Sequence, residues 1–162
     1  MNDHNVLGDL YEETVRYVRD HNQVDESTAR IQVREAVRYL ILVSAHREEL
    51  TGLFLPVEQA IDEVWHYLIL QTREYADLCE NRLPGGHFID HRSISYDAYG
   101  QRQPSREAMI EQFLRWIPLY CARFGEFDAE GGRWWTMVRF LHEEMGHSLA
   151  EISALAPADA PS

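Results

Sequence analysis

Residues 60–79 read AIDEVWHYLILQTREYADLC, and this stretch sets the main expectation for the fold. Its apolar side chains recur every three or four residues, the repeat that gathers them on one face of an α-helix. The resulting stripe comprises Ile61, Val64, Trp65, Leu68, Thr72, Tyr75 and Cys79. Proline is favoured in the first turn of a helix, so Pro56 is a natural start. We expect one long helix from Pro56 to about Leu83.

Four more amphipathic segments flank this helix, at about residues 6–21, 25–50, 105–124 and 133–155. Asp25 or Ser27 can cap the second of them, and Pro118 is expected to kink the segment that contains it. No segment is typical of a β-strand. The sequence therefore predicts an all-α, single-domain bundle of about five helices over residues 1–156, with a flexible tail at 157–162.

Between the third and fourth helices lies a long irregular loop at about residues 84–104. Pro84, Gly85 and Gly86 stop the preceding helix, and no hydrophobic period follows them. Structureless segments of this length inside a compact domain usually carry function. We expect the loop to act as a lid over a site.

The chain has a formal net charge of −12, and all 15 of its basic residues are arginines. An acidic protein without a basic block is not expected to bind nucleic acid or an anionic membrane surface. The absence of lysine excludes a Schiff-base lysine, so no pyridoxal phosphate is expected, and it excludes a phosphate-loop lysine for nucleotides. The arginine bias indicates a GC-rich, bacterial genome.

The row Arg30, Arg34 and Arg38 follows one helix face at four-residue spacing. We interpret it as a solvated face with Glu26 and Glu35 as ion-pair partners.

The two cysteines, Cys79 and Cys121, are too few for a disulfide framework and are not spaced as a zinc pair. The N-terminus has no secretory signal pattern, and no apolar run approaches the roughly 20 residues of a membrane span. A cytoplasmic location is expected. The oligomeric state is left open.

Asp62 and His66 are the leading candidates for chemistry. Four residues apart on a helix, they project from one face about 40° apart. They can supply two metal ligands, or Asp62 can orient His66 as a general base. Alternatively, the two form a structural ion pair beside Trp65.

The loop histidines His87 and His91 extend this set. The eight residues from Leu83 to His91 can span about 27 Å, enough to fold back to His66. Imidazole and carboxylate together suit zinc or non-haem iron. The alternative is a surface loop with two solvated histidines. Cys79 is not expected to join, because on a continuous helix it lies about 19 Å along and about 140° around from His66; a buried thiol is the better interpretation.

Weaker candidates lie elsewhere. Tyr96 and Tyr99 in the loop can line a pocket. Glu143 shares a helix face with His147 and can complete a metal site across the bundle, but His142 and His147 are five apart, so FLHEEMGHSL is not a zincin motif. A solvated charged face is the alternative.

The residues that follow Ile61 resemble a family motif: Asp-Glu-x-Trp-His, then Thr-x-x-Tyr, a cysteine, and a phenylalanine with a histidine. The matching residues are Asp62, Glu63, Trp65, His66, Thr72, Tyr75, Cys79, Phe88 and His91. This pattern resembles small bacterial relatives of the glycine-rich domain-containing protein family, over about residues 54–135. The resemblance implies a helical domain in which Asp62, His66 and His91 are grouped; it implies no particular reaction.

Two departures from the family pattern bear on the ligands. Leu68 stands where many relatives have a histidine, and Asp90 stands where many have the first of two adjacent histidines. If the family binds a metal, Asp90 can replace one ligand.

The sequence thus predicts a small metal-binding protein with iron or zinc on Asp62, His66 and His91, adjusted by His87 or Asp90. It would be a tailoring enzyme for a small molecule or peptide, working by metal-assisted hydrolysis or oxidation. Two alternatives stay open: a non-enzymatic helical interaction module, and a metal-free acid–base enzyme that uses Asp62 and His66.

Overall fold

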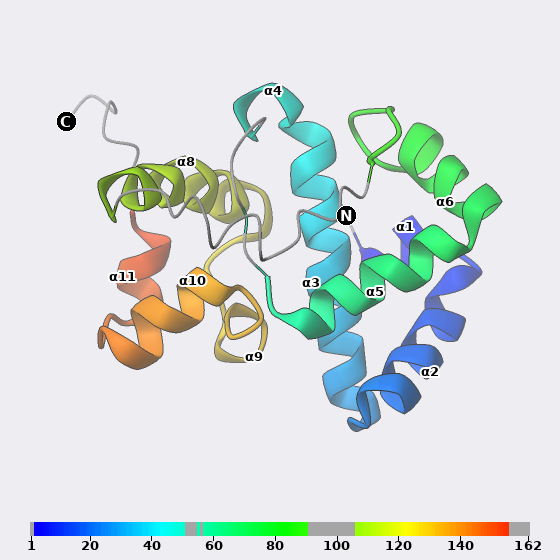
Figure 1. Ribbon diagram of the computed structural model, residues 1–162, viewed down its shortest axis with the longest axis horizontal. Coiled ribbons are helices and arrows are strands. Elements are labelled where there is room, and N and C mark those ends of the chain that lie inside the picture. The colour runs from blue at the N-terminus through cyan, green and yellow to red at the C-terminus, as the bar shows by residue number, and fades with distance from the viewer. Residues whose placement is uncertain (1, 51–54, 56, 91–105, 156–162) are drawn as a thin grey trace.

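The computed structural model describes residues 2–50, 55, 57–90 and 106–155. Within these residues the chain is helical, and the sole β contact is an isolated antiparallel bridge between Val57 and Trp135. Figure 1 shows α3 (Glu26–Ala45) running through the middle of the molecule. On one side of it lie α1, α2, α5 and α6, and on the other lie α8 to α11. The expected all-α class is confirmed.

The helices are more numerous and shorter than the sequence predicts. The first half of the described chain contains α1 (Asp3–Leu7), α2 (Leu10–Asn22), α3, α4 (Arg47–Leu50), α5 (Gln59–Leu70), α6 (Thr72–Asp77) and the π-helical turn η1 (Leu78–Arg82). The second half contains α8 (Arg106–Phe124), α9 (Ala129–Gly132), α10 (Thr136–Arg139), the π-helical turn η2 (Phe140–Glu144) and α11 (Leu149–Ser153).

Four of the five expected helices are broken, which corrects the predicted count. Gly8 and Gly146 have positive φ angles of 56° and 75°, a conformation that glycine adopts without strain, and they interrupt the first and last segments. The second segment breaks at His46, where φ is −121° and ψ is 40°. The third segment breaks at Gln71, where ψ of 65° leaves the helical range. In contrast, α8 runs through Pro118 without a break.

Local signals fix two helix starts, and the sequence predicts only the one at Asp25. The Asp25 carboxylate accepts a hydrogen bond of 2.7 Å from the Thr28 backbone N–H at the start of α3. A capping box at α11 pairs the Ser148 side chain with the Glu151 backbone and the Glu151 side chain with the Ser148 backbone. These side chains satisfy backbone donors that a helix start leaves without partners.

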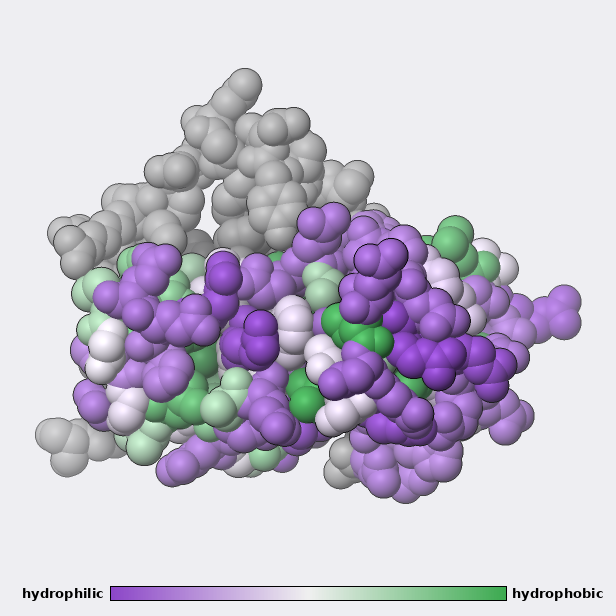
Figure 2. Space-filling model, turned by 90° about the horizontal axis from the view of Figure 1, so that it is seen from below, coloured by the Kyte–Doolittle hydropathy of each residue, from purple (hydrophilic) through white to green (hydrophobic). Residues whose placement is uncertain are grey.

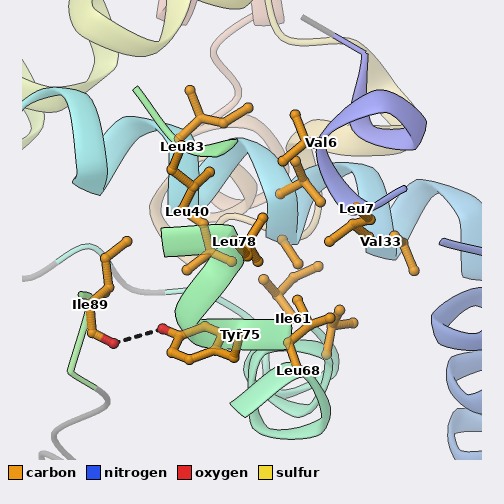
Figure 3. Packing of buried hydrophobic residues seen from close by; sticks show 14 of the residues in the cluster. Val6, Leu7, Val33, Leu40, Ile61, Leu68, Tyr75, Leu78, Leu83 and Ile89 are labelled. Carbon is orange, nitrogen blue, oxygen red and sulfur yellow. Dashed lines mark hydrogen bonds between the residues drawn. The ribbon is translucent and has the colours of Figure 1, made fainter. Parts of the chain in front are cut away.

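Two hydrophobic clusters form the core, one on each side of α3. The first joins α1, α2, α3, α5, α6 and η1 (Figure 3). The second joins the C-terminal part of α3 to α8 and α10 around the stacked indoles of Trp116 and Trp135, whose centroids lie 5.0 Å apart. Tyr39 and Val57 pack against both clusters.

A buried carboxylate also links α3 to the second cluster. Glu35 is completely buried, and its oxygens accept hydrogen bonds from four side chains: Arg34 (2.9 Å), Arg38 (3.2 Å), Tyr120 (2.9 Å) and Trp135 (2.9 Å). This corrects the expected solvated arginine face. Arg30 does pair with exposed Glu26, but Arg34 and Arg38 converge on a buried anion.

The surface is largely hydrophilic on the face shown in Figure 2, and apolar side chains reach it in small patches. Four large apolar residues are exposed in the described chain: Leu70, Phe88, Phe140 and Met145. No helix in the described ranges is long and apolar enough to cross a membrane.

Candidate functional site

Asp62 and His66 meet on the outer side of α5. The His66 Nδ1 atom lies 3.4 Å from Asp62 Oδ2, and the two side chains are 46% and 32% exposed. The i,i+4 spacing on a regular helix produces this contact, as the sequence predicts. An imidazole approached through Nδ1 by a carboxylate is held in one orientation, and this arrangement is common to histidine ligands and to histidine bases.

An aromatic layer lies directly beneath this pair. The Tyr39 ring on α3 contacts Trp65 at a centroid distance of 5.4 Å. Burial raises the pKa of Tyr39 to about 12, and the nearby negative charge of Asp62 adds to the effect. Asp62 therefore borders both His66 at the surface and a neutral phenol in the interior.

A chain of hydrogen bonds connects Trp65 to residues 84–90, the described part of the predicted loop. Trp65 Nε1 donates to the Tyr75 hydroxyl at 2.9 Å, and that hydroxyl donates to the Ile89 carbonyl at 2.7 Å. Figure 3 shows the Tyr75 hydroxyl directed at Ile89. The Phe88 ring packs edge-on against Tyr75 at 5.3 Å. Residues 88 and 89 are thus fixed beside α5.

The break at Gln71 makes this connection possible. On an uninterrupted helix the ten residues between Trp65 and Tyr75 would correspond to about 15 Å of axial rise. Because the chain turns at Gln71, α6 returns Tyr75 to the indole of Trp65.

Cys79 belongs to the same cluster as a buried thiol, as expected. Its accessible surface is zero and it forms no disulfide. Burial raises its pKa, while hydrogen bonds from the Ile89 backbone and from Tyr75 partly oppose that shift. A neutral thiol is a poor nucleophile and a poor metal ligand, so Cys79 has a packing role.

The base of the loop is also anchored on α3. The Gly85 N–H donates to Ser44 Oγ at 2.8 Å. A Cβ atom at residue 85 would lie 2.0 Å from the Ser44 carbonyl oxygen, so no larger residue fits without displacement. The Pro84–Gly86 turn therefore sits directly on the α3 backbone, which explains the need for glycine there.

The predicted site residues divide into two groups. Asp62, Trp65 and His66 lie together, and His87 is half-buried with its Nδ1 3.3 Å from the Gly85 carbonyl oxygen. His91, Tyr96 and Tyr99 lie outside the described residues.

No three His, Cys, Asp or Glu side chains in the described ranges are arranged to hold a metal ion. Asp62, His66 and His87 are therefore not a three-ligand set as they stand. A set completed by His91 stays a prediction.

The C-terminal candidates are engaged with one another. His142 Nδ1 lies 2.8 Å from the His147 carbonyl oxygen, and His147 Nδ1 lies 3.6 Å from Glu151. These contacts shape the turn around Gly146 and the start of α11. Glu143 is exposed on η2 and belongs to no three-ligand group among the described side chains.

Sequence reasoning missed Tyr39 and Ile89 as neighbours of the site. Tyr39 is 23 residues before Asp62 on another helix, and Ile89 contributes a backbone carbonyl, which no side-chain motif can reveal. Tyr75 was visible only as part of an apolar stripe and of the family-like pattern.

Replacing Tyr75 by phenylalanine is expected to loosen residues 87–90. The ring is kept, but Trp65 Nε1 and the Ile89 carbonyl lose a common partner, and a buried polar group left without one costs about 1–3 kcal/mol. We expect a loss of that size in urea unfolding, with faster amide hydrogen exchange in residues 84–90. Tyr67→Phe on the surface of α5 is the control, and unchanged exchange in Tyr75→Phe would show that the hydroxyl does not fix the segment.

Comparisons with known proteins give no relative for this chain. No family model, no curated protein and no solved structure matches it. The resemblance to the glycine-rich domain-containing protein family therefore stays a prediction from the motif.

Proposed function

We propose that this is a metal-binding helical protein in which His66, Asp62 and His91 hold zinc or iron. One observation carries the proposal: the Trp65–Tyr75–Ile89 hydrogen-bond chain fixes the segment that leads to His91 beside the helix that bears Asp62 and His66. His91 is two residues after Ile89, a distance of at most about 7 Å along the backbone. Asp90, which precedes it, is exposed and can supply a carboxylate.

Asp62 can have either of two roles in such a site. It can bind the metal itself, or it can hold His66 through Nδ1 so that Nε2 faces the metal, as carboxylates commonly do behind histidine ligands. The observed Nδ1–Oδ2 contact of 3.4 Å favours the second role. With zinc or iron bound, the site would supply Lewis-acid or redox chemistry for a tailoring reaction on a small molecule or peptide.

Elemental analysis of the untagged protein tests the proposal. We expect near-stoichiometric zinc or iron in the native chain and its loss in both His66→Ala and His91→Ala. His147→Ala, which removes an exposed histidine beside α11, should keep the metal. His66 is itself half-exposed, so its loss is expected to leave the fold intact by circular dichroism.

Asp62→Asn separates the two roles of Asp62. An orienting carboxylate replaced by an amide should weaken the metal affinity by about 10–100-fold, whereas loss of a direct ligand should abolish stoichiometric binding. A native protein that stays free of metal after reconstitution with either ion would overturn the proposal.

The same geometry supports one alternative, a metal-free acid–base enzyme. The specific observation is the oriented imidazole above an aromatic layer of Trp65 and Tyr39. In that case turnover of an identified substrate would survive chelators, and Asp62→Asn would lower it without any change in metal content.

A further inference from the structure

We propose a second ligand site, in the groove between the α1–α2 pair and the α6–η1 segment, and we infer that it takes a free α-amino acid with an apolar side chain. It contains neither Asp62 nor His66 and does not depend on the metal-binding proposal. The groove has a volume of about 510 Å³, within the range of small-molecule sites.

The break at Gln71 creates this groove. Helix α2 packs on α3 and α5, while α1 contacts η1. Beyond Gln71 the chain turns away from the axis of α5, so α6 diverges from α2 instead of continuing alongside it (Figure 1). A space open to solvent is left between the two walls and is closed at one end by the contact of α1 with η1.

The floor of the groove is apolar. Leu7 and Leu78 are members of the first hydrophobic cluster, and Leu10 packs against it. Leu7 and Leu78 are almost completely buried, so the half-buried Leu10 offers the apolar area on which an aliphatic side chain of a ligand would rest.

The α2 wall is anionic. Asp9 and Glu13 are one helical turn apart and both are exposed. They form no hydrogen bond or ion pair with any side chain in the described part of the chain, so their charges stay uncompensated within the groove. This wall suits an ammonium group.

The opposite wall carries both signs of charge, Arg73 and Arg82 together with Glu74 and Asp77, and its two guanidinium groups differ in their contacts. Arg82 is committed to the fold: Nε pairs with Asp77 at 3.1 Å, and Nη1 donates to the Val6 carbonyl at 3.4 Å. Arg73 is exposed and has no ion-pair partner among the described residues, although Glu74 is its neighbour. Arg73 is therefore the group that can receive a carboxylate, by the forked geometry that guanidinium offers.

The carboxylates of the α2 wall and the Arg73 guanidinium of the other wall, with Leu10 on the floor, define the ligand. Its ammonium would face Asp9 and Glu13, its carboxylate would face Arg73, and its side chain would lie on Leu10. A phosphorylated ligand is disfavoured, because the carboxylates of the α2 wall repel it.

Titration with L-leucine, followed by amide chemical shifts, tests this site. We expect saturable shifts confined to residues 6–13 and 73–82. Leucinamide lacks the carboxylate and 4-methylpentanoate lacks the ammonium, and each should bind about tenfold more weakly, the loss expected for one charge-assisted contact.

Two variants test which wall of the groove binds the carboxylate of the ligand and which binds its ammonium group. Arg73→Gln should abolish the preference for leucine over leucinamide, and Glu13→Gln should reduce the preference over 4-methylpentanoate. Arg123→Gln, with the same charge change on exposed α8, should alter neither. Shifts that map outside the groove, no saturable shift with leucine, or equal binding of the three compounds would each overturn the proposal, and none of these results bears on metal content.

Discussion

Glu35→Ala is expected to lower the free energy of unfolding by about 3–5 kcal/mol, the largest effect of any single substitution considered for this protein. The carboxylate is completely buried and accepts four hydrogen bonds, so its removal leaves four donors without their acceptor. Chemical denaturation followed by tryptophan fluorescence measures the change, since Trp135 is one of those donors.

The four donors do not contribute equally. Trp135 and Tyr120 are buried, so Nε1 and the hydroxyl would be stranded away from water, at about 1–3 kcal/mol each. The Arg34 and Arg38 side chains are 27% and 23% exposed and can turn toward solvent. Removing Glu35 therefore costs less free energy at these two donors. Arg34 also keeps Asp128 at 3.1 Å.

Two variants control for charge and for shape. Glu12→Ala removes an exposed carboxylate that pairs with Arg30, and exposed pairs contribute about 0–1 kcal/mol. Glu35→Gln keeps the size of the side chain but turns one acceptor into a donor that faces other donors. Its free energy of unfolding should therefore be close to that of Glu35→Ala. A Glu35→Ala protein as stable as Glu12→Ala would mean that the buried carboxylate contributes no net stability.

Glu35 also shows where sequence reasoning fails. It stands next to Arg34 and three residues before Arg38, a pattern typical of exposed helix faces. Its burial depends on Tyr120 and Trp135, which are 85 and 100 residues away in sequence. Gly131 completes the arrangement, since a Cβ atom there would lie 2.5 Å from both Arg34 Nη2 and Glu35 Oε1. No local pattern encodes such a contact.

Some of the helix breaks have a signal in the local sequence and others do not. Gly8 and Gly146 carry a recognisable signal, because isolated glycines in a helical pattern can mark an interruption. Gln71 carries none, since glutamine is a good helix former and the apolar repeat continues through it. The break is instead stabilised by tertiary contacts, above all the bond between Trp65 and Tyr75.

For the candidate site, sequence reasoning reached as far as contacts within one helix. The i,i+4 rule placed Asp62 beside His66. It could not place Ile89 against Tyr75 or Tyr39 beneath Asp62, since these contacts follow from how α3, α5 and α6 pack. The packing that the sequence could not reveal is also what brings the approach to His91 near α5.

Cooperative unfolding between about pH 10 and pH 12 is the second large expected effect. Four tyrosines have raised pKa values, each chiefly through burial, and the largest shifts are those of Tyr39, Tyr75 and Tyr120. The charge of Glu35 raises the pKa of Tyr120 further, whereas Arg38 opposes it. Burial favours the neutral phenol, so the folded state retains protons that the unfolded state loses near pH 10.

Proton linkage gives the direction in which the free energy of unfolding changes with pH. Below about pH 10 all three phenols are protonated in both states, and their contribution to stability is complete. Above it, the unfolded chain ionises first, and each tyrosine removes about 1.4 kcal/mol of stability per pH unit. For Tyr39 this loss ends near pH 12, whereas for Tyr75 and Tyr120 it continues beyond that point. Three such groups together remove about 8 kcal/mol by pH 12, comparable to the whole stability of a small domain.

Tyrosinate absorbance and circular dichroism, recorded on one pH series, check this expectation. Both signals should change together, because the buried phenols ionise only when the chain unfolds. Tyr39→Phe keeps the ring but removes one titrating group, so stability should fall about one third less steeply between pH 10 and pH 12, and the alkaline midpoint should rise. Tyr17→Phe, a half-buried ring on α2, is the matched control. If tyrosinate absorbance rose well before helicity was lost, the three phenols would be accessible to base in the folded protein, and the packing of Tyr39 and Tyr75 around the candidate site would be looser than the structure describes.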